Sequence, residues 1–158
     1  MIRPANSEDV VAISSLTEAI GLFEDHELEA FAGMISEHLE GEQEDQCWVV
    51  DEAKGLWGAA YYAPEAFSDG VWNLYFIGVH PEQQGKGRGT ALLQYVEQAL
   101  IETGARLLLV ETSGLGSFEL TRTFYRKNGY DEEARIRDFY KPGDDKVIFR
   151  KVLSQMEG

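Results

Sequence analysis

One segment of the chain combines alternating glycines with two basic residues. It reads Val79-His80-Pro81-Glu82-Gln83-Gln84-Gly85-Lys86-Gly87-Arg88-Gly89-Thr90-Ala91-Leu92-Leu93. The apolar pattern favours a strand before the glycines and a helix after them, so backbone N–H groups and the positive end of a helix would point into one small volume. Glycine lets an anion approach the main chain closely and permits positive φ angles. The segment therefore predicts a phosphate-binding loop.

The spacing of the glycines excludes the two commonest nucleotide loops. The pattern G-x-x-x-x-G-K-[ST] fails because Gly85-Lys86 is followed by Gly87. The pattern G-x-G-x-x-G fails because Thr90 occupies the position of the third glycine. The ligand must therefore be a phosphate compound that a different loop recognises.

The residues instead match Q-x-x-G-x-G, with Gln84, Gly87 and Gly89 placed after a strand that ends in V-H-P. This pattern resembles the pyrophosphate-binding signature for acetyl-coenzyme A in the GNAT family of N-acetyltransferases. The resemblance implies that acetyl-coenzyme A is the co-substrate and that no metal takes part. The cofactor-binding residues that it implies are Ile77, Gly78, Val79, Gln84, Gly85, Lys86, Gly87, Arg88, Gly89, Thr90, Ser117 and Tyr125.

A second segment, residues 123–130, resembles the F-Y-x-x-x-G-[FY] stretch of the same family. The resemblance implies that Tyr125 faces the cofactor sulfur. A tyrosine with its usual pKa of about 10 keeps its proton at neutral pH, so it can act as the general acid toward a thiolate whose thiol has a pKa of about 8.5. Many family members carry Asn seven residues before this Tyr to contact the pantetheine arm. Phe118 stands there in this chain, and Ser117 is the candidate replacement.

The general base is harder to assign from the sequence. An alkylammonium acceptor has a pKa of about 10.4 and must lose a proton before it attacks. The strand residues 72–77 contain no carboxylate, so Glu111, at the end of the next strand, is the best substitute, acting through a water. The alternative is an ordinary capping or salt-bridged glutamate.

Residues 137–145 carry a third and weaker resemblance. They are similar to the Y-Y-x-x-G-E-D-A hairpin of protein N-terminal acetyltransferases, including those that act on ribosomal proteins, in which Tyr140 would match a tyrosine that contacts the acceptor. The alternative is an ordinary hairpin with aromatic strand residues. The other acceptor-binding candidates are Phe23, Asn73 and Tyr75.

The elements that must position these residues follow the order β α α β β β α β α β β. Helices are expected over 6–20, 27–41, 85–103 and 117–128, and strands, after a brief extended start, over 46–51, 56–62, 71–80, 106–111, 134–141 and 146–153. The fourth and fifth strands are joined by a helical crossover and are therefore expected to be parallel. The fold class is α/β (α+β), and the resemblance implies the GNAT fold, a mixed, mostly antiparallel seven-stranded sheet with strands 4 and 5 splayed.

The composition limits the partners. The chain has 158 residues, enough for one domain over 1–158, and its 28 acidic residues outweigh its 14 basic ones. A net charge of −14 disfavours nucleic acid and anionic membranes, and no apolar run resembles a membrane span or a signal peptide, so we expect a cytoplasmic protein. Residues 1–46 hold 12 acids and one base, which predicts either a solvated helical face or a field that attracts a cationic substrate. His26 and His38 in this region are expected at the surface.

Together these patterns predict an enzyme that moves an acetyl group from acetyl-coenzyme A to a primary amine by direct attack in a ternary complex. The alternative is a non-catalytic acyl-coenzyme A sensor of the same fold, and a longer acyl donor is open as well. The sequence leaves the acceptor open between a small molecule and a protein amine, and it leaves open whether the chain forms a homodimer.

Overall fold

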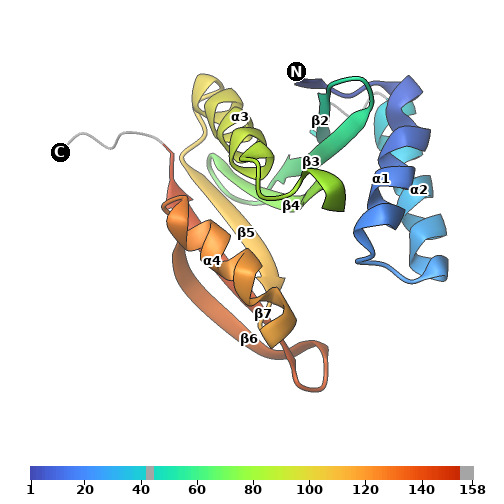
Figure 1. Cartoon of the computed structure of the whole chain (residues 1–158). Helices are drawn as coiled ribbons and strands as arrows, with labels where there is room; N and C mark the ends of the chain where they lie inside the picture. The colour runs from blue at the N-terminus through green and yellow to red at the C-terminus, as the bar shows by residue number, and fades with distance from the viewer. Residues whose placement is uncertain (42–44, 154–158) are drawn as a thin grey trace. The chain divides into compact units, whose positions relative to one another are not determined.

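The computed structural model describes residues 1–41 and 45–153 (Figure 1). Its strands form a seven-stranded sheet. The strand order is β1 (Ile2–Pro4), β2 (Cys47–Glu52), β3 (Leu56–Pro64), β4 (Val71–Val79), β5 (Leu107–Ser113), β7 (Asp144–Val152) and β6 (Asp131–Lys141). β4 and β5 are parallel, in a register that runs from Val71 opposite Leu107 to Leu74 opposite Val110. The pairs β1–β2, β2–β3, β5–β7 and β6–β7 are antiparallel. The mixed sheet confirms the predicted fold class, including the parallel pair.

The chain divides into two compact units. The first unit contains Met1–Ala63 and Phe76–Val96, and the second contains Pro64–Tyr75 and Glu97–Gly158. The division falls inside β4 (Val71–Val79) and inside α3 (Arg88–Glu102). Among the described residues, no helix is both long and apolar enough to cross a membrane.

The first unit begins with β1 (Ile2–Pro4), the short helix η1 (Ser7–Asp9), α1 (Val10–Ile20) and α2 (Asp25–Glu40). A capping box lies at the start of η1. The Asn6 side chain accepts a hydrogen bond from the N–H of Glu8, and the Asp9 carboxylate accepts one from the N–H of Asn6. α1 ends at Gly21, whose φ of 77° is typical of a helix C-terminus. The two helices lie side by side (Figure 1).

The core of the first unit lies between these helices and the strands β2 (Cys47–Glu52) and β3 (Leu56–Pro64). Ile13, Leu16 and Ile35 are buried on the helix side. Aromatic rings complete the core: Trp48 stacks on Tyr61 with 4.8 Å between ring centroids. This packing explains the apolar helical spacing in the sequence.

The second unit is built on β5 (Leu107–Ser113), β6 (Asp131–Lys141) and β7 (Asp144–Val152), with η3 (Gly116–Phe118) and α4 (Glu119–Lys127). α4 lies along β6 and β7 (Figure 1). The side chains that fill its core are fully buried: Leu108, Val110, Val147 and Phe149.

Several predicted boundaries were wrong by a few residues. β6 begins at Asp131 rather than 134, and β7 begins at Asp144, so only Pro142 and Gly143 form the turn between them. α3 begins at Arg88 because the preceding glycines adopt positive φ angles. β5 covers Leu107–Ser113 rather than 106–111.

Candidate functional site

The predicted phosphate loop lies in the first unit, between η2 (Pro81–Gln83) and α3. Gly85 and Gly87 have φ angles of 76° and 80°, and a Cβ atom at either position would have nothing within 4 Å. The main chain there is therefore open to an approaching ligand. The first N–H groups of α3 have no acceptor inside the helix and carry the positive end of its dipole. A pyrophosphate fits this donor set.

Hydrogen bonds fix the entry to the loop. The N–H of His80 donates to the carbonyl oxygen of Trp57 at 2.8 Å, and the Gln84 side-chain amide donates to the carbonyl oxygen of Val79 at 3.1 Å. His80 Nδ1 accepts from the N–H of Glu82. His80 is thus a capping residue of the turn, and Gln84 ties the loop back to the end of β4.

Arg88 is anchored by an ion pair that the sequence did not reveal. Its guanidinium lies 2.8 Å from the carboxylate of Asp51 and 3.2 Å from the side-chain oxygen of Gln83. Asp51 is 4% exposed, so this contact joins the start of α3 to β2. Lys86 is exposed, and its ammonium lies 3.5 Å from the same Gln83 oxygen. Of the two predicted cationic residues, Lys86 is the one whose charge faces solvent.

The end of β4 is tightly packed at Gly78. A Cβ there would lie 2.6 Å from Cδ1 of Ile20 and 2.8 Å from Cζ of Phe76. A larger residue at position 78 would require the side chains of Ile20 and Phe76 to move.

Tyr125 lies in the second unit, on α4. It is 4% exposed, and its ring packs at 5.9 Å from that of Tyr130 and 5.6 Å from that of Phe149. Burial raises the pKa of the Tyr125 hydroxyl above its usual value, so the group stays protonated at neutral pH. Its hydroxyl makes no hydrogen bond to the described part of the chain. The neighbouring Tyr130 differs, because its hydroxyl donates to Glu97 at 2.5 Å.

A polar cluster on the second unit brings together three of the predicted residues. The side-chain amide nitrogen of Asn73 donates to Oε1 of Glu111 at 3.0 Å and to Oε1 of Glu65 at 2.8 Å. The hydroxyl of Tyr75 donates to the same oxygen of Glu65 at 3.2 Å. Sequence reasoning missed Glu65. The signal for it is the β3–β4 hairpin, where the N–H of Glu65 bonds to the carbonyl of Val71 and so places Glu65 beside the start of β4.

Lys146 and two aromatic side chains extend this cluster. The ammonium of Lys146 lies 3.0 Å from Oε2 of Glu111 and 3.6 Å from the centre of the Phe139 ring. Tyr140 is 46% exposed, and its pKa is raised by partial burial and by the negative charges of Glu111 and Asp144. The predicted base and the predicted acceptor tyrosine are therefore electrostatic neighbours.

The remaining predicted residues lie elsewhere. Phe23 is half-buried and stacks on Phe31 with 4.9 Å between ring centroids, so it packs within the first unit. Ser117 is exposed in η3, just before α4. His38 is half-buried rather than at the surface, and its Nδ1 accepts a hydrogen bond from the indole of Trp48.

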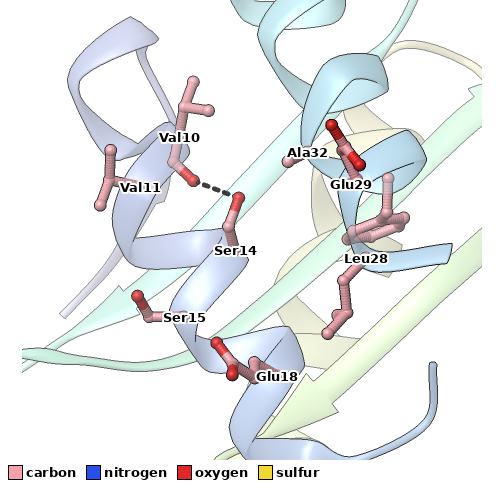
Figure 2. Close-up of a pocket in the computed structure, with 9 residues that line it drawn as sticks. Val10, Val11, Ser14, Ser15, Glu18, Leu28, Glu29 and Ala32 are labelled. Atoms are coloured by element: carbon pink, nitrogen blue, oxygen red, sulfur yellow. Dashed lines mark hydrogen bonds between the residues drawn. The ribbon is translucent and has the colours of Figure 1, made fainter. Parts of the chain in front are cut away.

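A surface pocket of about 410 Å³ opens between α1 and α2 (Figure 2). Figure 2 shows side chains of both helices around it, with Ser14 donating a hydrogen bond to the carbonyl oxygen of Val10. Its lining is mostly apolar, with Glu18 and Glu29 adding negative charge. Both helices lie in the acidic first third of the chain, residues 1–46.

A scan against family models matches residues 43–132 to the acetyltransferase (GNAT) domain. A search of curated proteins found no match. Among solved structures, a protein from Desulfovibrio desulfuricans assigned to the GNAT acetyltransferase family is 34% identical, with a TM-score of 0.91 over 98% of this chain and 99% of that one.

Two less similar structures share the fold. The ribosomal-protein-S18-alanine N-acetyltransferase from Escherichia coli is 20% identical, with a TM-score of 0.81 over 100% of this chain and 96% of that one. An acetyltransferase from Salmonella typhimurium, solved with acetyl-CoA, is 16% identical, with a TM-score of 0.77 over the same shares of the two chains. The glycine loop, the mixed sheet and the family match agree, and the chain belongs to the GNAT acetyltransferase family.

Proposed function

We propose that this chain is an N-acetyltransferase that moves the acetyl group of acetyl-coenzyme A to a primary amine by direct attack in a ternary complex. The observation that carries the proposal is the loop at residues 84–90, where two glycines in the left-handed region leave open main chain beside the N-terminus of α3. This loop would hold the pyrophosphate, with Lys86 adding a solvent-facing charge. Ile77, Val79 and Ser117 would contact the rest of the cofactor.

In the reaction, a bond forms between the amine nitrogen and the acetyl carbonyl carbon while the carbon–sulfur bond breaks. The nitrogen gives up a proton, and the departing thiolate takes one. Tyr125 would supply the proton that the thiolate takes. Burial raises the pKa of its hydroxyl, and this hydroxyl makes no hydrogen bond within the described part of the chain. A backbone N–H such as that of Val79 would polarise the carbonyl.

Glu111 would accept the proton from the amine. One of its oxygens accepts a hydrogen bond from Asn73 and the other forms an ion pair with Lys146, and both contacts orient the carboxylate and favour a relay through one water over direct contact. Tyr75 and Tyr140 would border the acceptor, which we propose to be cationic because the first third of the chain is strongly acidic.

The rival function is a sensor that binds acyl-coenzyme A without turning it over. An acceptor screen with acetyl-coenzyme A and detection of free thiol separates the two functions. Calorimetry on the same protein shows whether the cofactor binds. Binding with no thiol release for any amine would favour the sensor, whereas thiol release that depends on an amine supports the enzyme. The same screen with longer acyl donors determines the chain-length preference.

A further inference from the structure

Asn73 carries an unusual polar atom. Its side chain is 1% exposed, and its Oδ1 is a buried side-chain oxygen that has no hydrogen-bond partner among the described residues. Buried polar atoms are normally paired, so an unpaired one calls for an explanation. Here the explanation lies in what surrounds it.

The orientation of this amide is forced. Its nitrogen donates to Oε1 of Glu65 at 2.8 Å and to Oε1 of Glu111 at 3.0 Å. Turning the amide over would set its oxygen against two carboxylate oxygens, which can only accept. The unpaired oxygen is therefore a true acceptor, held beside two carboxylates.

The two carboxylates differ in whether a positive charge balances them. Glu111 forms an ion pair with Lys146 at 3.0 Å. Glu65 receives hydrogen bonds only from the neutral side chains of Asn73 and Tyr75, and no cationic side chain in the described ranges forms an ion pair with it. The second oxygen of Glu65 accepts no hydrogen bond within those ranges. The cluster thus has one more negative than positive charge, and two of its acceptors, the second oxygen of Glu65 and Oδ1 of Asn73, are unpaired within the described residues.

We propose that Glu65 and Asn73 Oδ1 anchor a protonated amino group of the acceptor, distinct from the nitrogen that is acetylated. The inference rests on the proposed function, which assigns the reacting nitrogen to the Glu111 side. An alkylammonium has three N–H donors, which are enough for the two unpaired acceptors, and its positive charge balances the cluster. Because Glu65 and Glu111 hydrogen-bond to the same amide nitrogen, their bonded oxygens lie less than two hydrogen-bond lengths apart. The acceptor is therefore a primary amine with a second ammonium on a short chain.

Matched acceptors test this anchor. 1,3-Diaminopropane and propylamine share a three-carbon chain and differ by one amino group. With acetyl-coenzyme A, the diamine should give a kcat/KM about tenfold higher in the parent protein. The E65Q variant keeps an oxygen that can accept from Asn73 and loses the negative charge. It should therefore raise the KM for the diamine and so lower its kcat/KM to the value for propylamine. Propylamine itself should be affected less than twofold.

The matched control is E119Q, which removes an exposed carboxylate from α4 and should leave kcat/KM unchanged for both amines. E65D, which restores the charge, should recover part of the preference for the diamine. If E65Q weakens both amines equally, or neither, the anchor is wrong while the proposed function stands.

A binding readout separates the anchor from the proposed function. In the absence of cofactor, 1,3-diaminopropane dihydrochloride should shift the side-chain amide signals of Asn73 in a nitrogen–proton correlation spectrum, and E65Q should abolish the shift. Saturation of this shift without any turnover would support the anchor and contradict the proposed function. An equal shift with potassium chloride would overturn the anchor, because the site would then bind any monovalent cation.

Discussion

The guanidinium of Arg88 lies 2.8 Å from the carboxylate of the buried Asp51, and this pair connects the start of α3 to β2. The contact positions the loop from a distance of 37 residues along the chain. The geometry of the loop should therefore depend on Asp51, a buried residue of β2 that lies outside the loop.

We expect D51N to lower the free energy of unfolding by about 1.5 to 3 kcal/mol, since the hydrogen bond between the two side chains loses the negative charge of its acceptor. It should also weaken acetyl-coenzyme A binding, because the first turn of α3 loses its tether. Chemical denaturation and calorimetry measure the two effects. E133Q is the control, since Glu133 is exposed and forms no ion pair or side-chain hydrogen bond within the described residues. Equal effects of D51N and E133Q would contradict the role of the pair.

Replacing Gly87 by Val should abolish cofactor binding in calorimetry while the circular dichroism spectrum is preserved. The φ of 80° strains any L side chain, and the new side chain would occupy the open space above the main chain. G33A is a suitable control, because Gly33 also has open space around it but lies within α2, where alanine is preferred by about 1 kcal/mol. Unchanged affinity in G87V would rule out the pyrophosphate site.

Y125F should lower kcat by about 10² to 10⁴-fold, the usual contribution of a general acid, and leave the cofactor Kd within about twofold. Because burial raises the pKa of Tyr125, the parent enzyme should show no activity loss from its ionisation below about pH 10. Steady-state rates across pH and calorimetry check both points.

The comparison for Tyr125 is Y130F, which removes a hydroxyl that bonds to Glu97. This variant should lose stability and keep its turnover. A parent-like kcat in Y125F at neutral pH would exclude the general-acid role.

His38 should make the first unit sensitive to mild acid. Burial lowers the pKa of His38, so the folded state prefers the neutral ring, whose Nδ1 accepts from Trp48. The resulting stability is present above the unfolded pKa of about 6.5 and is lost as the pH falls below it. Denaturation curves between pH 7.5 and 5 should show this loss, and H38Q should reduce it. H26Q, at an exposed position, should leave the slope unchanged.

The apparent KM for a cationic acceptor should rise with ionic strength, whereas that for a neutral acceptor should not. The acidic first third of the chain acts mainly on encounter, and salt screens it beyond about 8 to 10 Å under physiological conditions. Y140A should raise the KM for the same acceptor, since Tyr140 is half exposed beside the Glu111 cluster. A best acceptor that is anionic, or an unchanged KM in Y140A, would contradict this placement.

Much of the fold and the cofactor loop could be predicted from local signals. Apolar periodicity indicated the helices and strands in their correct order. The glycine spacing indicated a loop in which some residues have positive φ angles, and the structure assigns these to Gly85 and Gly87. These features depend on residues close together in the chain. The start of α3 was misplaced because the same glycines that open the loop delay the helix.

Contacts between residues that are far apart in the chain could not be predicted from the sequence. Asp51 and Arg88 meet only through strand order, and Glu65 reaches Asn73 only through the hairpin geometry. The sequence therefore indicated Glu111 as the best candidate base and gave no sign of Glu65. His38 looked exposed because its helix is acidic, and its burial follows from packing against Trp48 and Tyr61.

The strand order β5-β7-β6 has a consequence for folding during synthesis on the ribosome. β5 pairs with β7 along its whole length, from Leu107 opposite Val152 to Ser113 opposite Lys146, yet β7 follows the other six strands along the chain. Until β7 is synthesised, one edge of β5 has no partner, and the buried side chains of Leu108 and Val110 lack the strand that carries Phe149. We therefore expect the second unit to be prone to aggregation during synthesis until β7 has emerged.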